Sequence, residues 1–383
     1  MHSRYPTPRS AALLLAFISS AMAAQPRYDV VNLRPLGFRN AYALNNHGHV
    51  AGESSNGLIL WNRETVSQLP TPIQGPVITD FNDAGDLVGY YSNPAFEGNR
   101  GFAIIDGNLK EIEQSSVATG INNTGQISLI SGTPSRALIN QAGTRTDIGS
   151  LGGPMTGITA LNTAGWAVGS SSTTLVADPR HAFLFRNGTL TDLGTLGGDQ
   201  SGATDINDAG NIVGSARADV GGKSRATLYT GGKVLQIGSH RAEGDYGARR
   251  INNYNVVLGH FATGPSLWSG GIVKPLAKLV DLAGLGLNVV ELIDFNDRGE
   301  ILVRAWEGWW VQERDVFLLT PRLLPSARLT AIAARSIAGT NDQTSISGFV
   351  LAGGSTEGAP SSSAPSVPDS LPSASPTPPS IPP

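Results

Sequence analysis

Three short segments of the sequence carry clustered oxygen-bearing side chains at a fixed spacing. Each reads Asp-x-Asn-Asp-x-Gly, and they begin at Asp80, Asp205 and Asp294. Carboxylate and amide oxygens are ligands for hard cations such as calcium. However, the fifth and twelfth positions, where an EF-hand loop places oxygen ligands, hold Ala, Arg or Tyr here. We therefore interpret these residues as stabilisers of tight turns and expect no cofactor, with calcium as the disfavoured alternative.

A cluster of tryptophans could bind a ligand by stacking. Trp306, Trp309 and Trp310 are half of the six tryptophans in the chain and lie within five residues. Such rings stack on sugar faces or anchor a protein partner. The alternative is that they pack between neighbouring repeats of the fold.

The composition excludes several kinds of catalytic site. The chain has no cysteine, so thiolate nucleophiles, zinc–thiolate sites and disulfides are absent. It also lacks a His-Glu-x-x-His metal motif, a Gly-x-Ser-x-Gly elbow and a P-loop. Paired carboxylates of the kind that hydrolyse glycosides can come from distant positions, so an enzyme stays open. A formal net charge of −3 argues against nucleic acid as a partner.

The N-terminus has the features of an export signal. Arg4 and Arg9 precede an apolar run at 11–18, and small residues at 21–23 supply a cleavage site. Residues 1–23 are therefore predicted to be a signal peptide, and the mature protein to be secreted or periplasmic. The apolar run is too short to span a bilayer, and no second span follows, so we expect no membrane span.

These side chains must be positioned by a repeated element. A segment of the form apolar–Asn–x–x–Gly–x–apolar recurs seven times, with spacings of 37 to 45 residues between the copies. Its anchoring residues are Asn45, Asn82, Asn122, Asn162, Asn207, Asn252 and Asn296. The third residue after each anchor is Gly in six copies and Asn255 in the other, which predicts a turn position with positive φ. Each anchor is expected to hydrogen-bond the turn backbone two residues on.

The rest of each repeat supplies further strands. Short apolar segments follow each turn, as in 181–185 (HAFLF) and 225–229 (RATLY), and a further segment such as 191–198 (TDLGTLGG) completes the unit. Four strands in about 42 residues is the size of one propeller blade. The last copy stops after its third strand, whereas 28–37 precedes the first copy and resembles a fourth strand. The sequence thus predicts an all-β, seven-bladed β-propeller closed by an N-terminal strand.

The segments HAFLF, TDLGTLGG and INDAGNIVGSA, which run in this order through 181–216, resemble the HAF repeats of exported bacterial proteins. The resemblance covers roughly 28–321 and is strongest in the repeats anchored at Asn162 and Asn207. It implies a secreted repeat protein of propeller type. It implies no catalytic residues.

The sequence after the repeats changes in character. The propeller is expected over 24–321, and 322–354 resembles the start of a short β-rich module found after repeat regions in exported bacterial proteins. Residues 355–383 hold nine prolines and nine serines, so they are predicted to be a disordered tail.

The predicted function is a non-catalytic binding scaffold for a glycan or cell-envelope protein. The alternatives are a propeller-type polysaccharide hydrolase or lyase, and a structural repeat protein of the envelope. Loops between the second and third strands vary in length, and variable loops on a rigid frame commonly carry recognition. The candidate ligand-binding residues assigned to these loops are Tyr90, Tyr91, Phe96, Arg180, Trp309 and Trp310.

Overall fold

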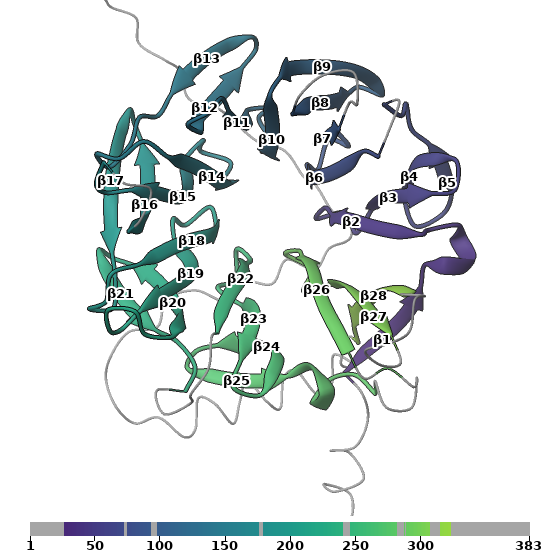
Figure 1. Cartoon of the computed structure of the whole chain (residues 1–383). Coiled ribbons are helices and arrows are strands. Elements are labelled where there is room, and N and C mark those ends of the chain that lie inside the picture. Colours follow the sequence, from purple (N-terminus) through teal and green to yellow (C-terminus); the bar gives the residue numbers. More distant parts are fainter. Residues whose placement is uncertain are drawn as a thin grey trace, which may run out of the picture. The chain divides into compact units, whose positions relative to one another are not determined.

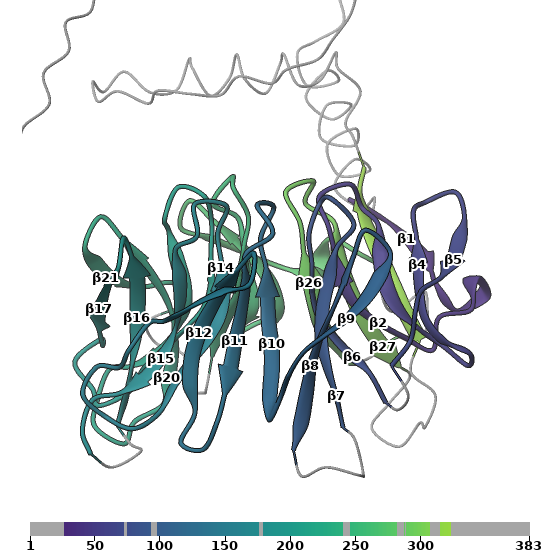
Figure 2. The same ribbon diagram turned by 90° about the horizontal axis from the view of Figure 1, so that it is seen from above.

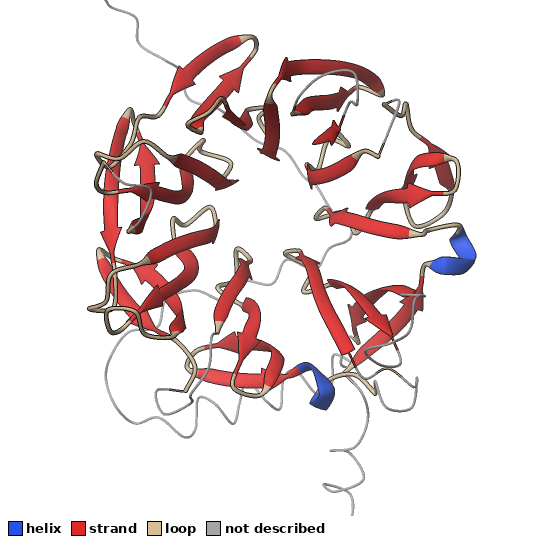
Figure 3. Ribbon diagram, in the orientation of Figure 1, coloured by secondary structure: helices blue, strands red, loops and turns tan. Residues whose placement is uncertain are grey.

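The computed structural model describes residues 27–72, 75–92, 98–175, 179–239, 246–281, 287, 289–306 and 315–322. It contains seven four-stranded antiparallel sheets arranged as the blades of a propeller around one axis (Figure 1). Strands dominate the described residues, and the helical segments among them are two single 3-10 turns (Figure 3). The predicted fold class is confirmed. The predicted signal peptide, nearly all of 322–354 and the whole tail lie outside the described residues.

Each blade runs from an innermost first strand to an outermost fourth strand. Blade one is β2 (Asn40–Leu44), β3 (Val50–Ser54), β4 (Gly57–Trp61) and β5 (Val66–Gln68). Blade two is β6 (Val77–Phe81), β7 (Leu87–Ser92), β8 (Asn99–Ile105) and β9 (Asn108–Gln114). Blade three is β10 (Ser116–Ile121), β11 (Ile127–Ser131), β12 (Arg136–Gln141) and β13 (Thr144–Asp147). Blade four is β14 (Thr156–Leu161), β15 (Ala167–Ser172), β16 (Arg180–Arg186) and β17 (Thr189–Gly194).

Blades five and six follow the same pattern, and blade seven is shared between the two ends of the propeller. Blade five is β18 (Ser201–Ile206), β19 (Ile212–Arg217), β20 (Ser224–Thr230) and β21 (Lys233–Gln236). Blade six is β22 (Gly247–Ile251), β23 (Val257–Phe261), β24 (Gly264–Ser269) and β25 (Ile272–Pro275). Blade seven is β26 (Val289–Phe295), β27 (Ile301–Trp306), β28 (Asp315–Pro321) and β1 (Tyr28–Asn32). The 3-10 turns η1 (Arg34–Leu36) and η2 (Leu276–Lys278) connect blades.

The N-terminal strand closes the ring, as the sequence predicts. β1 pairs antiparallel with β28 over five residues, from Tyr28 opposite Pro321 to Asn32 opposite Phe317. The Tyr28 hydroxyl also donates to the carbonyl of Gly299, in the first turn of the same blade. One sheet therefore joins the two ends of the propeller, and β1 covers the edge of β28.

The turns divide between two opposite faces of the ring (Figure 2). The first turn of every blade has five residues between its strands, and the third turn usually has two. These turns share one face, which we call the turn face. The second and third strands of each blade are joined at the opposite face, the loop face, and the numbers of residues between these strands in blade order are 2, 6, 4, 7, 6, 2 and 8. Only the loop face therefore varies strongly from blade to blade.

The first turns need a left-handed backbone at their third residue after the anchor. The six glycines at this position have φ between 74° and 95°, and Asn255 has φ of 59°. This outcome confirms the positive φ inferred from the Gly-to-Asn exchange, because Asn tolerates that conformation better than other residues with a side chain.

The blades pack face to face through apolar layers. Leu44 and Trp61 of blade one contact Leu302 and Leu318 of blade seven in one such layer. Similar layers lie between the other blades, with Phe102 and Phe183 fully buried. Burying a side chain of this size contributes roughly 2 kcal/mol, so each interface between blades contributes to one cooperative ring.

Candidate functional site

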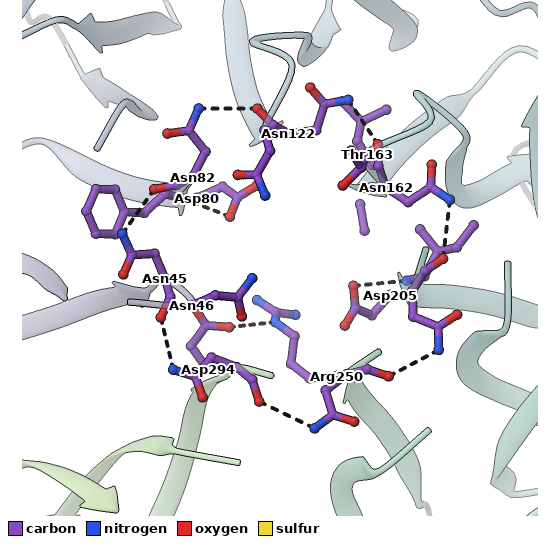
Figure 4. A pocket seen from close by; sticks show the side chains of 18 of the residues that line it. Asn45, Asn46, Asp80, Asn82, Asn122, Asn162, Thr163, Asp205, Arg250 and Asp294 are labelled. Atoms are coloured by element: carbon purple, nitrogen blue, oxygen red, sulfur yellow. Dashed lines mark hydrogen bonds and ion pairs between the residues drawn. The ribbon is translucent and has the colours of Figure 1, made fainter. Parts of the chain in front are cut away.

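The anchoring asparagines meet at the axis of the propeller (Figure 4). Each one follows the innermost strand of its blade, and all seven are 3–5% exposed. Together with their neighbours they line a polar cavity of about 200 Å³. The seven repeats of the sequence thus converge on one site.

Each anchor hydrogen-bonds the next blade as well as its own turn. Its Nδ2 donates to the main-chain oxygen of the following anchor, from Asn45 to Asn82 around the ring to Asn296, which donates to Asn45 at 2.9 Å. Its Oδ1 accepts the N–H four residues on in every copy, and the N–H two residues on in three copies. The predicted bond two residues on is therefore present in three of the seven copies, and neither the bond four residues on nor the ring of seven bonds between blades was predicted. Each anchor uses its amide both as a donor and as an acceptor. Ionised Asp can only accept hydrogen bonds, so it could not replace Asn here.

The residues that directly follow the anchors in the sequence form a second polar ring. It lies at the mouth of the cavity, which we call the channel. Its members are Asn46, Asp83, Asn123, Thr163, Asp208, Asn253 and Asp297. At six of the seven positions, the main-chain N–H donates to the side chain of the next blade at 2.8–2.9 Å. Amides and carboxylates also pair directly, as where Asn253 donates to both Asp208 and Asp297. The mouth is therefore a largely self-satisfied hydrogen-bond network.

Three carboxylates and one guanidinium lie two residues before their anchors. Asp80, Asp205 and Asp294 each accept the next N–H of their own strand and one N–H of another inner strand, at 2.8–3.0 Å. Arg250 Nε donates to Asp294 Oδ1 at 2.9 Å. The three aspartates are the first residues of the Asp-x-Asn-Asp-x-Gly segments. They cap backbone groups, and the described residues contain no group of three or more His, Asp or Glu arranged to hold a metal.

Burial and neighbouring charges shift the pKa of Asp80, Asp205 and Arg250. Burial, with a smaller effect of the nearby Asp294, raises the pKa of Asp80 to about 6, although backbone hydrogen bonds oppose the shift. Burial likewise raises the pKa of Asp205 to about 7, against the attraction of Arg250. Burial alone would lower the pKa of Arg250, but Asp294 and Asp205 more than offset it, so that pKa is raised. The channel thus holds carboxyl groups that titrate near neutral pH.

The residues predicted to bind a ligand are found in different environments. Tyr90 and Tyr91 belong to β7 and not to the loop that follows it. Tyr91 is 3% exposed, its ring packs near Phe102, and its hydroxyl donates to Glu111, so it is a core residue. Arg180 begins β16 and is half-buried, with its guanidinium 3.3 Å from the sulfur of Met155. Phe96, Trp309 and Trp310 lie outside the described residues, and their role stays a prediction.

The loop face carries exposed apolar side chains. Among the described residues, two large ones are at least 80% exposed, Leu175 and Val220. They lie in the second loops of adjacent blades, four and five. Gly-Gly pairs are hydrogen-bonded to the strand ends from which these loops start. The N–H groups of Gly153 and Gly198 donate to the carbonyls of Ser172 and Arg217. A Cβ at Gly153 would lie 2.2 Å from a carbonyl oxygen, which explains the glycines of the TDLGTLGG-type segments.

Comparisons with known proteins find distant structural similarities. No family model and no curated protein matches the sequence. An acylaminoacyl peptidase from Pyrococcus horikoshii is similar over 67% of this chain and 48% of its own, with 14% identity and a TM-score of 0.44. The extracellular domain of BT4673 from B. thetaiotaomicron, described in one structure as a one component system and in another as a hybrid two component system, has 11% identity and a TM-score of 0.29 in both. These two matches cover 74% and 76% of this chain. The chain spans about half the length of each of these proteins.

Proposed function

We propose that this protein is an exported, non-catalytic scaffold that binds a glycan or a cell-envelope protein on its loop face. In this proposal residues 1–23 direct export and are cleaved, and the propeller presents its variable loops outside the cytoplasm. No helix among the described residues is long and apolar enough to cross a membrane.

The observation that carries the proposal is the pair of exposed side chains on neighbouring loops. Leu175 and Val220 are 90% and 80% exposed and lie on loops of seven and six residues. Contiguous exposed apolar side chains mark interaction surfaces, whereas isolated ones are ordinary. These two residues support the proposal because they are the most exposed large apolar side chains among the described residues and lie on adjacent loops of one face. The rigid ring beneath these loops, closed by hydrogen bonds and by β1, reduces the entropy lost when a ligand binds.

The channel gives less support to an enzyme. Asp80, Asp205 and Asp294 line the channel, and each already accepts two backbone N–H bonds. The carboxylates at the mouth, Asp83, Asp208 and Asp297, also accept hydrogen bonds from neighbouring blades. A general acid or base must instead reach a substrate proton through a free oxygen. A polysaccharide hydrolase or lyase therefore remains the second candidate, and a structural envelope protein the third.

A capture experiment tests the proposal. The chain from residue 24 onward would be immobilised and exposed to envelope glycans and envelope proteins, with and without calcium. We expect capture without release of cleaved sugar, and a loss of about tenfold or more in Leu175→Ser with Val220→Ser. Ile272→Ser is the matched control, because Ile272 is 61% exposed on the turn face. Cleavage products would establish the enzyme instead, and equal capture by both variants would remove Leu175 and Val220 from the site.

The predicted tryptophans are tested in the same assay. Trp309→Ala with Trp310→Ala should abolish capture and leave the melting temperature within a few degrees, since stacked aromatics at such sites contribute on the order of 2 kcal/mol each. Unfolding of the double variant would instead assign both rings to packing between blades.

A further inference from the structure

Two grooves open on the turn face between adjacent blades. The larger, of about 680 Å³, lies between blades four and five and includes Trp166, Thr189, Thr191 and Tyr229 in its lining. The second, of about 530 Å³, lies between blades three and four and includes Gln126, Thr144, Thr146 and Phe185. Both volumes are in the range of small-molecule sites. The labels β10 to β21 in Figure 1 mark the three blades concerned.

The grooves are copies of one site, displaced by one blade. Gln126 and Trp166 are each the fourth residue after an anchor, and each lies over a glycine of the next blade. A Cβ on that glycine, Gly165 or Gly210, would come within 2.4 Å of the amide or 2.6 Å of the indole. The strand registers also match, because Thr146 pairs with Ile139 as Thr191 pairs with Leu184. The same register places Phe185 and Tyr229 at equivalent positions.

Side chains occupy the equivalent space at two other interfaces. Between blades seven and one, the buried Glu300 lies over Gly48 and forms an ion pair with Arg63. Between blades five and six, Asn255 replaces the glycine, and its Oδ1 accepts from Asn211 Nδ2 at 2.8 Å. The grooves around blade four therefore reflect the particular side chains of these repeats and are not a general consequence of the fold.

The lining suits an uncharged ligand with many hydroxyl groups. The groove between blades three and four is lined by hydroxyl, amide and apolar groups without a charge. Between blades four and five the lining holds three charged side chains, Arg186, Asp192 and Lys233. Lys233 is exposed at the start of β21, and the other two charges are already engaged. Arg186 lies 5.0 Å from the centre of the Trp166 ring, and Asp192 contacts His181 Nδ1 at 2.8 Å. The exposed threonines on the fourth strands are left to exchange hydrogen bonds with a ligand.

We propose that the two grooves are adjoining subsites for one linear, uncharged oligosaccharide that crosses blades three to five on the turn face. A repeating ligand fits a repeating site, because equivalent groups recur at the spacing of one blade. This surface is opposite the loop face, so the proposal does not depend on the ligand expected there. Linking two subsites through one ligand also makes affinity depend on ligand length.

The test uses steric blocks and a ladder of neutral oligosaccharides. The probes are β-1,4- and α-1,4-linked glucans of two to eight units, titrated calorimetrically into the chain from residue 24 onward. Thr191→Trp blocks one groove and Thr146→Trp the other. Ser67→Trp is the matched control, because Ser67 pairs with Leu60 in blade one as Thr191 pairs with Leu184 in blade four. All three positions are exposed, so the variants should fold normally.

We expect the affinity of the protein to increase with the length of the glucan. The unmodified chain and Ser67→Trp should bind the longest glucan of one ladder about tenfold or more tighter than the shortest. Each groove variant should lose this gain, leaving long and short probes within twofold of each other. Length-independent binding, no binding of either ladder, or equal effects of all three substitutions would overturn the proposal. Leu175→Ser with Val220→Ser should not change this binding, and a loss in that variant would also overturn the assignment to the turn face.

Discussion

The stability of the propeller should fall as the pH rises from 5 to 8, and Asp205 should account for much of the fall. Burial raises the pKa of this carboxyl from 3.8 to about 7. Between these values the folded protein holds a proton that the unfolded chain has released. Folding is therefore favoured at low pH, and the advantage is lost as the pH passes through about 7.

The magnitude follows from the width of the pH window. Two pH units, from 5 to 7, correspond to about 2.7 kcal/mol for one group. The side chain of Asp205 is only partly buried and lines the channel, so we discount this figure and expect about 1.5 kcal/mol from it. Asp80, whose pKa is raised to about 6, adds a smaller contribution of the same sign.

Asp205→Asn isolates the effect. The amide keeps an acceptor for the N–H of Ile251 and stays uncharged at every pH. Denaturant unfolding of both proteins at pH 5, 6, 7 and 8 and constant salt gives, for each protein, the slope of the unfolding free energy against pH. Burial lowers the pKa of His49 and His260, which act in the opposite direction but are common to both proteins. We expect the change in unfolding free energy between pH 5 and 8 to differ by about 1.5 kcal/mol. Identical slopes, or an unmodified protein that gains stability toward pH 8 relative to the variant, would refute the reasoning.

Three further predictions concern the ring itself. Asn162→Asp removes the donor to the carbonyl of the next anchor and places a buried carboxylate next to that carbonyl, so the free energy of unfolding should fall by about 3 kcal/mol. The control Asn187→Asp, in an exposed turn, should change it by under about 0.5 kcal/mol. Equal melting temperatures of these two variants would contradict a structural role for the ring. Tyr229→Phe should change stability by less than about 1 kcal/mol, because the buried hydroxyl makes at most a weak hydrogen bond, with Ser201; a larger loss in denaturant unfolding would contradict this. Deletion of residues 24–38 should expose the edge of β28 and cause aggregation or a much lower melting temperature in a thermal scan, and melting within a few degrees of the intact chain would argue against closure by β1.

The number of blades and their closure could be read from the sequence because they depend on local signals. The turn residues, from Gly48 to Gly299, need a left-handed backbone whatever surrounds them, and the exchange to Asn255 made that need visible. The apolar segments that follow the turns have the length of strands. The complementary ends, 28–37 and the unfinished last repeat, were enough to predict that β1 completes blade seven.

Only the tertiary structure decided which groups meet between blades. An anchor and the carbonyl that accepts from it are 37 to 45 residues apart in six cases and 251 in the seventh, and their contact depends on the ring being closed. For the same reason Asp80, Asp205, Asp294 and Arg250 share one channel although they come from four blades. Whether Tyr91 faces a ligand or the core depends on where β7 ends, and whether Trp166 borders a groove depends on the glycine of the next blade. Sequence periodicity defines each blade, but packing between blades sets the channel and the grooves, because those contacts join residues that no local pattern links.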